Sequence, residues 1–158
     1  MYSNKLVYNI LIYINNNITD KITINDLEKK FFYNRYYIMK IFKKEIGITI
    51  IEYINSIRIY NSLLQIKNSS YLLTSIAIRN GFSSLEYFSE TCRQITKLNP
   101  RIFKNYFSNK KYLPINQVNL INAAMVSLYE ISCIKDNYLS KTKSDDAPVK
   151  NLTLFTFK

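Results

Sequence analysis

Two divergent copies of one pattern lie on this chain, and this repeat limits the possible folds more than any other feature. The stretch FYNRYYIMKIFKKEIGITIIEY begins at Phe32, and the stretch GFSSLEYFSETCRQITKLNPRIF begins at Gly81. Residues of similar character recur 50 positions apart: Ile38 with Phe88, Lys43 with Arg93, Thr49 with Asn99 and Tyr53 with Phe103. Each copy has the pattern of a helix, a tight turn and a second helix with a polar outer face. The repeat therefore predicts a tandem helix-turn-helix.

Helical periodicity predicts two elements ahead of the polar-faced helix of the first copy. Apolar residues at helical spacing over residues 6–14 predict a first, supporting helix. Thr23, with Asp26 three positions later, has the spacing of a capping box. A second helix is therefore expected to start at Thr23 and to run to about Phe31.

A third helix and a long connector complete the first copy. Asn34 is the expected cap of the third helix. The inward face of that helix is expected to carry Tyr37, Ile38, Ile41 and Phe42. Gly47 stands where a helix end favours a left-handed residue, and Thr49 can cap a connector helix over about 51–66. A connector of that length would span about 24 Å.

The second copy repeats this scheme. We expect a supporting helix over 73–80, a turn at Gly81, a cap at Ser83 or Ser84, a polar-faced helix over 85–94, and a last short helix opened by Pro100. Three aromatic residues at helical spacing are expected in the core of this copy: Tyr87, Phe88 and Phe103. The second half of the repeat should therefore occupy about 71–107.

The residues after about 112 differ in character and are treated as a C-terminal extension, 113–158. An amphipathic helix is predicted by the spacing of Val118, Ile121, Met125 and Leu128. The polar stretch 136–146 is expected to be loose, and the apolar stretch 152–157 has the composition of a strand. Residues 1–112 then form one all-helical domain, and the role of the extension stays open.

The charge of the chain indicates a polyanionic partner. Lysine and arginine number 22 against 11 acidic residues, which gives a net charge of +11. The excess is uneven, because residues 1–112 carry +10 and the extension carries +1. Neutralising phosphates releases condensed counterions, so such a surface favours nucleic acid. A solvated basic surface without a partner is the alternative.

Catalysis and metal binding find little support in the sequence. The chain has no histidine, so a Ser-His or Cys-His nucleophile cannot be built, and the acidic residues are scattered. Cys92 and Cys133 lack metal-ligand spacing. We therefore expect no enzymatic activity, no metal and no cofactor. No segment has the character of a signal peptide or a membrane span, so a cytoplasmic, nucleoid-associated protein is expected.

At this point the residues resemble a known family, the AraC/XylS type of bacterial transcription regulators, in its tandem helix-turn-helix domain. The resemblance covers about residues 5–107. It rests on FKKEIG at Phe42, EYINSIRI at Glu52, SIAIRNGFSSLEYFSE at Ser75, and Asn99, Pro100 and Phe103. The resemblance implies an all-α, homeodomain-like fold of two helix-turn-helix subdomains, joined by the linker helix and followed by a tail with a helix. It also implies a small stand-alone member that binds double-stranded DNA.

Several positions depart from the family pattern. Family members usually carry Ala at Glu28, Gly at Phe32, Ala at Asn61, Phe at Cys92 and Gly at Lys97. Each departure is expected to loosen packing without changing the fold. Arg58 matches a basic position of the family, and we expect it to bridge the two halves by pairing with a carboxylate or a helix end rather than to contact DNA.

The resemblance implies that the helix starting near Arg35 is the first recognition helix. Tyr36 and Lys40 are expected to approach base edges, and Met39 either contacts a thymine methyl group or is partly buried. The expected contacts to the DNA backbone are Asn34, Arg35, Lys43, Lys44 and Thr49. A solvated basic helix is the alternative.

The helix starting near Leu85 would be the second recognition helix. Its candidate base-reading residues are Ser84, Leu85, Glu86, Ser89 and Glu90, and its candidate backbone contacts are Ser83, Arg93, Arg101 and Lys104. Glu86 and Glu90 would repel phosphates unless they accept hydrogen bonds from cytosine amino groups. The first helix is therefore expected to dominate binding, and a second helix that reads no bases is the alternative.

The family implies a transcriptional activator that contacts RNA polymerase. The acidic second helix and the unassigned extension leave a rival hypothesis open. In it, the chain is a degenerate family member with weak DNA binding that modulates another regulator, or associates with itself, through the extension.

Overall fold

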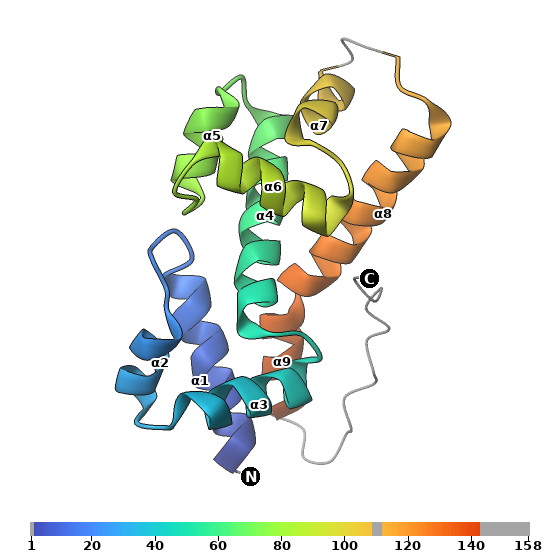
Figure 1. Ribbon diagram of the computed structural model, residues 1–158. Helices are drawn as coiled ribbons and strands as arrows, with labels where there is room; N and C mark the ends of the chain where they lie inside the picture. Colours follow the sequence, from blue (N-terminus) through green and yellow to red (C-terminus); the bar gives the residue numbers. More distant parts are fainter. Residues whose placement is uncertain (1, 109–111, 143–158) are drawn as a thin grey trace.

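The computed structural model describes residues 2–108 and 112–142, and every regular element within these ranges is a helix (Figure 1). The helices are α1 Tyr2–Asn16, α2 Ile24–Phe31, α3 Arg35–Ile46, α4 Ile50–Asn68, α5 Leu73–Arg79, α6 Leu85–Thr96, α7 Pro100–Phe107, α8 Ile115–Ser132 and α9 Ile134–Thr142. The predicted all-helical tandem arrangement is confirmed. We call α1–α3 the first head and α5–α7 the second head.

The long helix α4 connects the two heads and contributes to the hydrophobic core of each. It has 19 residues, somewhat more than the predicted 51–66, and is therefore about 28 Å long. Tyr53 and Ile57 are buried with the first head, and Ile59 and Leu63 are buried with the second. The two heads thus pack on opposite ends of α4 (Figure 1).

The helix starts predicted from the sequence are confirmed. Thr23 and Asp26 form a capping box at α2, and Thr49 forms another with Glu52 at α4. The Asn34 side chain accepts from the Tyr36 N–H at 2.9 Å. Of the two serines proposed for the start of α6, Ser84 is the cap. These local hydrogen bonds fix where α2, α3, α4 and α6 begin, whereas α5 starts after Leu72 without a side-chain cap.

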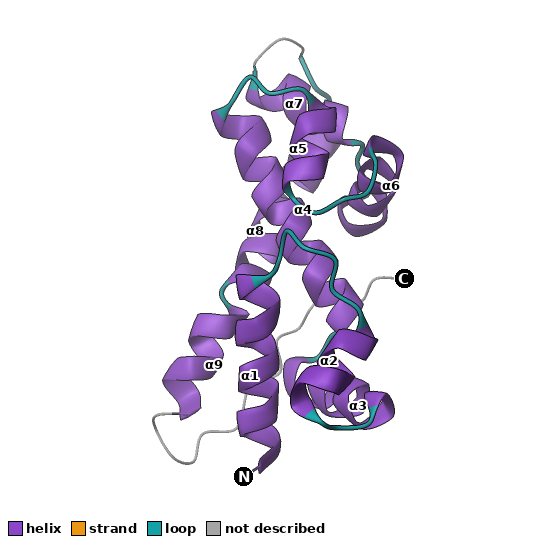
Figure 2. Ribbon diagram, turned by 90° about the vertical axis from the view of Figure 1, so that its left-hand side faces the viewer, coloured by secondary structure: helices purple, strands orange, loops and turns teal. Residues whose placement is uncertain are grey.

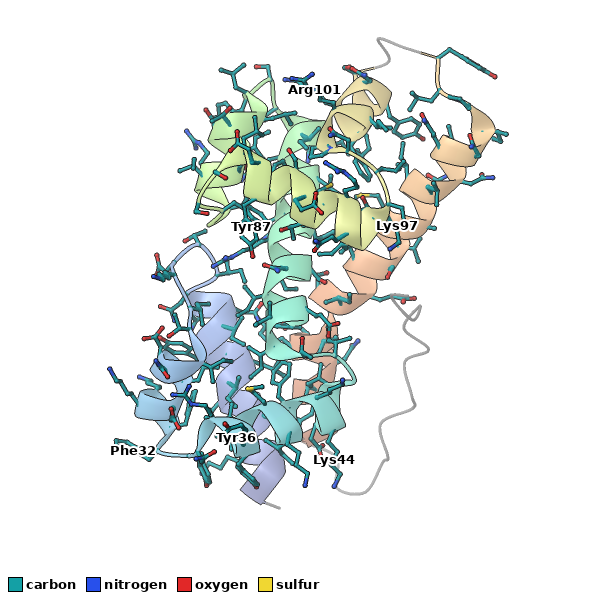
Figure 3. All side chains as sticks on the ribbon, viewed as in Figure 1. Phe32, Tyr36, Lys44, Tyr87, Lys97 and Arg101 are labelled. Carbon is teal, nitrogen blue, oxygen red and sulfur yellow. The ribbon has the colours of Figure 1, made fainter. Side chains whose placement is uncertain are left out.

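Two of the departures from the family pattern act through the backbone. Phe32 has φ 59° and Lys97 has φ 65°, so both occupy the left-handed region where the family carries glycine. A side chain in this region costs conformational energy, and looser packing at these two positions stays a prediction. Phe32 is 91% exposed and points away from the molecule (Figure 3).

Two tyrosines predicted in the cores lie at their edges. Tyr37 is 43% exposed and stacks on Tyr33 with ring centroids 5.5 Å apart. Tyr87 is 44% exposed and meets the ring of Phe82 edge-on. Helical periodicity places both residues at the margin of an apolar face, where the phenol group can stay in water. Phe88 and Phe103 are fully buried, as predicted.

The C-terminal extension is more ordered than the sequence suggested. The predicted amphipathic helix is confirmed as α8, which packs against α4 and α6. The expectation of a loose stretch from residue 136 was wrong as far as residue 142, because α9 continues to Thr142 and packs on α1. The predicted strand at 152–157 lies outside the described residues.

Candidate nucleic-acid interface

The two predicted recognition helices, α3 and α6, lie on the same side of the molecule. Both face the viewer in Figure 1, and both lie along the right-hand side in Figure 2. Each is preceded by its supporting helix, α2 or α5, at the turn of a helix-turn-helix. This arrangement is the one required for two helices to approach one duplex together.

The outer face of α3 combines exposed lysines with two exposed apolar side chains. Tyr36 is 75% exposed and Met39 is 46% exposed, so Met39 is partly buried. Lys40, Lys43 and Lys44 are also exposed. Figure 3 shows Tyr36 and Lys44 on the outside of the first head. These five residues of α3, all predicted to contact DNA, are therefore accessible to a duplex.

Arg35, at the start of α3, is instead engaged by the first head itself. Its Nη2 lies 3.0 Å from Glu28 Oε2 and also donates to Asn25 Oδ1. The Arg35 backbone N–H donates to Glu28 Oε1 at 3.0 Å, and this hydrogen bond is the main reason that the pKa of Glu28 is lowered. Glu28 thus caps α3 and neutralises Arg35, so Arg35 must leave this pair to hold a phosphate fully.

Glu28 is a residue whose role the sequence reasoning missed. It was expected only to loosen packing where the family carries Ala. A carboxylate seven residues ahead of a helix N-terminal arginine was the available signal, because negative charge is favourable at a helix N-terminus. The contact itself depends on the turn between α2 and α3, which the sequence does not specify.

The outer face of α6 has a different chemistry. The Ser84 hydroxyl accepts from the Tyr87 N–H at 3.1 Å, and Leu85 is half-buried against the second core. Ser83 and Glu86 are exposed, whereas Ser89 is half-buried. The structure therefore leaves Glu86 as the most accessible of the predicted base-reading residues near the start of α6.

Glu90 and Arg93 neutralise each other on the surface of α6. Their charged groups are 3.3 Å apart, and Gln94 donates to Glu90 at 3.2 Å. Both side chains are about half exposed, so the pair contributes little to stability. The contrast with α3 is one of charge, since the outer face of α3 presents Lys40, Lys43 and Lys44 to solvent.

An open groove of about 860 Å³ lies between the starts of α5 and α7 and the outer face of α6. Arg93, Arg101 and Lys104 line it together with Glu86 and Glu90. Arg101 is exposed, and Lys104 donates to the Tyr71 carbonyl at 3.5 Å. The groove brings together all the basic residues predicted for the second head.

Thr49, which was predicted to contact the DNA backbone, is committed to a local role. Its N–H donates to Glu52 Oε2 at 2.7 Å, and its hydroxyl accepts from the Glu52 N–H at 3.2 Å. A DNA contact by Thr49 stays a prediction.

Arg58 connects the two heads, as expected, but it binds backbone carbonyls of the α1–α2 loop rather than a carboxylate or a helix end. It is buried, and it donates through Nε to the Ile18 carbonyl at 2.8 Å and through Nη2 to the Asp20 carbonyl at 2.6 Å. Burial lowers the pKa of its guanidinium. A Cβ at Gly81 would lie 3.0 Å from Arg58 Nε and 2.9 Å from the Thr19 carbonyl. The α1–α2 loop of the first head and Gly81 of the second head therefore both lie against Arg58 of α4.

Other kinds of site are not apparent in the residues that the structure describes. In that part of the chain no three histidine, cysteine or acidic side chains are grouped to hold a metal ion. Burial raises the pKa of the Cys92 thiol to about 12, which keeps it unreactive. Among the same residues, no helix combines the length and apolarity needed to cross a bilayer.

Comparison with known proteins identifies this arrangement. Residues 27–106 match the family described as helix-turn-helix domain. The chain is 23% identical over 99 residues to the transposon Tn10 TetD protein of Escherichia coli, covering 63% of this chain and 72% of TetD. It is 20% identical over 103 residues to the HTH-type transcriptional activator AarP of Providencia stuartii, covering 65% of this chain and 76% of AarP.

A longer relative and a solved structure agree with the match to the helix-turn-helix family. The transcriptional regulatory protein HptR of Staphylococcus aureus is 32% identical over 99 residues, which are 63% of this chain but only 39% of HptR. The C-terminal domain of AraT, a response regulator from Geobacillus stearothermophilus, has the same fold, with a TM-score of 0.61, 18% identity, and coverage of 69% of this chain and 88% of that domain. The chain therefore belongs to the AraC-type helix-turn-helix family of DNA-binding transcription regulators.

Proposed function

We propose that this protein binds specific DNA sequences by placing α3 and α6 in successive major grooves of one duplex, and that α3 supplies most of the affinity. The observation that carries this proposal is the position of both helices on one side of α4, with exposed lysines concentrated on α3. The length of α4, about 28 Å, suits two recognition helices whose centres must lie about one turn of DNA, ~34 Å, apart.

The exposed residues of α3 divide naturally into two roles. Tyr36, Met39 and Lys40 lie in its first half, where a recognition helix approaches base edges. Lys40 suits the acceptors of guanine, and Met39 suits a thymine methyl group. Lys43 and Lys44 lie in the last turn and suit phosphates. The second head would hold the backbone through Arg101 and Lys104.

Glu86 gives the second head its own base preference in this proposal. A carboxylate can accept a hydrogen bond from a cytosine amino group but is repelled by phosphates. Because Arg93 neutralises Glu90, Glu86 is left as an exposed acceptor in the first turn of α6. We therefore expect a preference for cytosine in the groove that α6 enters, with a small contribution to total affinity.

We further propose that the protein activates transcription, because the similar protein AarP is named a transcriptional activator. Contact with RNA polymerase is the route that the family implies. The rival role, modulation of another regulator through the extension, predicts weak binding to every duplex. The two roles therefore differ in how strongly binding depends on DNA sequence.

The test is a fluorescence anisotropy titration on a duplex selected from a random pool and on a random duplex, each at several salt concentrations. Lys40→Ala should cost about 1–3 kcal/mol on the selected duplex and much less on the random one. Lys5→Ala, which removes the same charge from the exposed surface of α1, is the matched control and should have little effect on either. Equal losses for Lys40→Ala on both duplexes would contradict base reading by α3.

A further inference from the structure

The C-terminal extension buries side chains in the cores of both heads. Ile121 and Leu128 of α8 belong to the second core. Ile131, at the end of α8, belongs to the first core, as do Ile134 and Tyr138 of α9. One short stretch of chain, 121–138, therefore spans from one head to the other. Its apolar side chains would have to be exposed if the heads moved apart.

The extension runs beside α4 and leaves the candidate DNA interface open. α8 packs against α4 and α6, and α9 packs against α1 (Figure 1). In Figure 2, α9 lies on the opposite side of the molecule from α3 and α6. The extension can therefore stay in place while both recognition helices approach a duplex.

We infer that α8 and α9 form a brace that fixes the distance and angle between the two heads. The brace thereby determines the spacing that the protein accepts between its two half-sites, the DNA segments that α3 and α6 contact. Long helices are rarely straight and curve gently, so α4 alone leaves the two heads some freedom to bend towards or away from each other. A second helix packed along it, with apolar anchors in both cores, opposes that motion, because bending would pull apolar surface out of at least one core. Arg58 opposes it further, because it holds α4 to the α1–α2 loop beside Gly81.

The spacing part of this inference rests on the proposed function, whereas the brace itself does not. A change of one base pair between half-sites moves them apart by about 3.4 Å and rotates them by about 35°. Heads held rigidly cannot follow such a change, so binding to a respaced duplex must lose one head or bend the DNA. Heads joined only by α4 would tolerate it better.

The first measurement is the distance distribution between two spin labels on the full chain, which needs no DNA. Lys29→Cys on α2 and Ser75→Cys on α5 place labels on exposed positions outside the candidate interface, in a Cys133→Ser background. Ile134→Ala with Tyr138→Ala removes two anchors from the first core. The distribution should widen at least about twofold in this variant. Leu120→Ala with Val126→Ala, on the exposed surface of α8, is the matched control and should leave the width unchanged.

A second variant guards against loss of folding. Inserting Gly-Ser-Gly between Ser132 and Cys133 keeps every apolar anchor but separates α9 from α8, so that Ile131 is the one described residue of α8 that still ties it to the first core. It should also widen the distribution. An unchanged width in the insertion variant, or the same widening in the Leu120/Val126 control, would overturn the brace.

The DNA arm uses the selected duplex with one or two base pairs added between its half-sites. The parent protein should lose at least about tenfold in affinity on the respaced duplex, and the insertion variant should lose clearly less. Equal losses would overturn the role in spacing even if the brace is real. If neither the parent protein nor any variant binds DNA, the proposed function fails, and the label distances still decide the brace.

Discussion

Arg58→Met tests whether the junction between the heads depends on one buried guanidinium. The substitution keeps an apolar stem of similar length and removes the two hydrogen bonds to the Ile18 and Asp20 carbonyls. Hydrogen bonds from a charged donor are worth about 1.5–3 kcal/mol each. In the parent protein the stabilisation from these two hydrogen bonds is partly offset by the cost of burying the guanidinium charge. The same burial lowers the pKa of Arg58.

The net effect should be a loss of about 2–3 kcal/mol in the free energy of unfolding. Both carbonyls belong to the α1–α2 loop, where water can partly replace the guanidinium, so a larger loss is not expected. The free energy of unfolding of Arg58→Lys should lie between those of the parent protein and of Arg58→Met, because an ammonium group lacks the planar fork that reaches both oxygens.

Urea unfolding followed by circular dichroism measures this difference. The slope of the transition should stay unchanged if the folded and unfolded states keep their compactness. Arg101→Met, at an exposed arginine, is the control and should change stability by less than about 0.5 kcal/mol. A loss below about 1 kcal/mol for Arg58→Met, or an equal loss in the control, would refute the reasoning.

Three further predictions concern strain, reactivity and pH. Phe32→Gly should stabilise the fold by about 0.5–1 kcal/mol in thermal or urea unfolding, because glycine accepts the left-handed backbone; destabilisation would show that the exposed ring has a packing role. In alkylation at pH 8, the half-buried Cys133 should react first and Cys92 only as fast as the protein opens, and equal rates would contradict the burial of Cys92. Burial raises the pKa of Tyr53 to about 12. The contribution of the neutral phenol to the free energy of unfolding should therefore be fully present below about pH 10 and be lost as the pH rises towards 12. Tyr53→Phe, which loses the hydrogen bond from Asn15, should be less stable at pH 7 by about 1 kcal/mol, and this deficit should shrink between pH 10 and 12; a constant deficit would exclude titration of Tyr53.

The helices of the two heads and most of their starts could be predicted from the sequence because they depend on neighbouring residues, whereas α9 was not predicted. Thr23 with Asp26, Asn34 and Thr49 form caps within three positions of themselves. The repeat extended this local information to the second head, where Ser84 takes the place of Asn34. The two cores then followed from helical spacing, except at Tyr37 and Tyr87, which lie at the edge of an apolar face.

The features that were missed depend on contacts between distant residues or on backbone angles. The spacing of Glu28 ahead of Arg35 was a signal, but their contact depends on the turn between α2 and α3, which the sequence does not specify. The left-handed backbone of Phe32 and Lys97 is indicated only by the glycines that the family carries at these positions, because neither residue is itself glycine. The sequence predicted α8 but not its position, because one amphipathic face is equally compatible with a partner protein and with the two cores that Ile121 and Ile131 join.

The most direct test of two-groove binding is a hydroxyl-radical footprint of the full chain on a duplex selected from a random pool. The account predicts two protected segments on one face of the duplex, about ten base pairs apart, with weaker protection under the second head. A single protected segment, or no protection even in dilute buffer, would contradict the claim that α3 and α6 engage one duplex together.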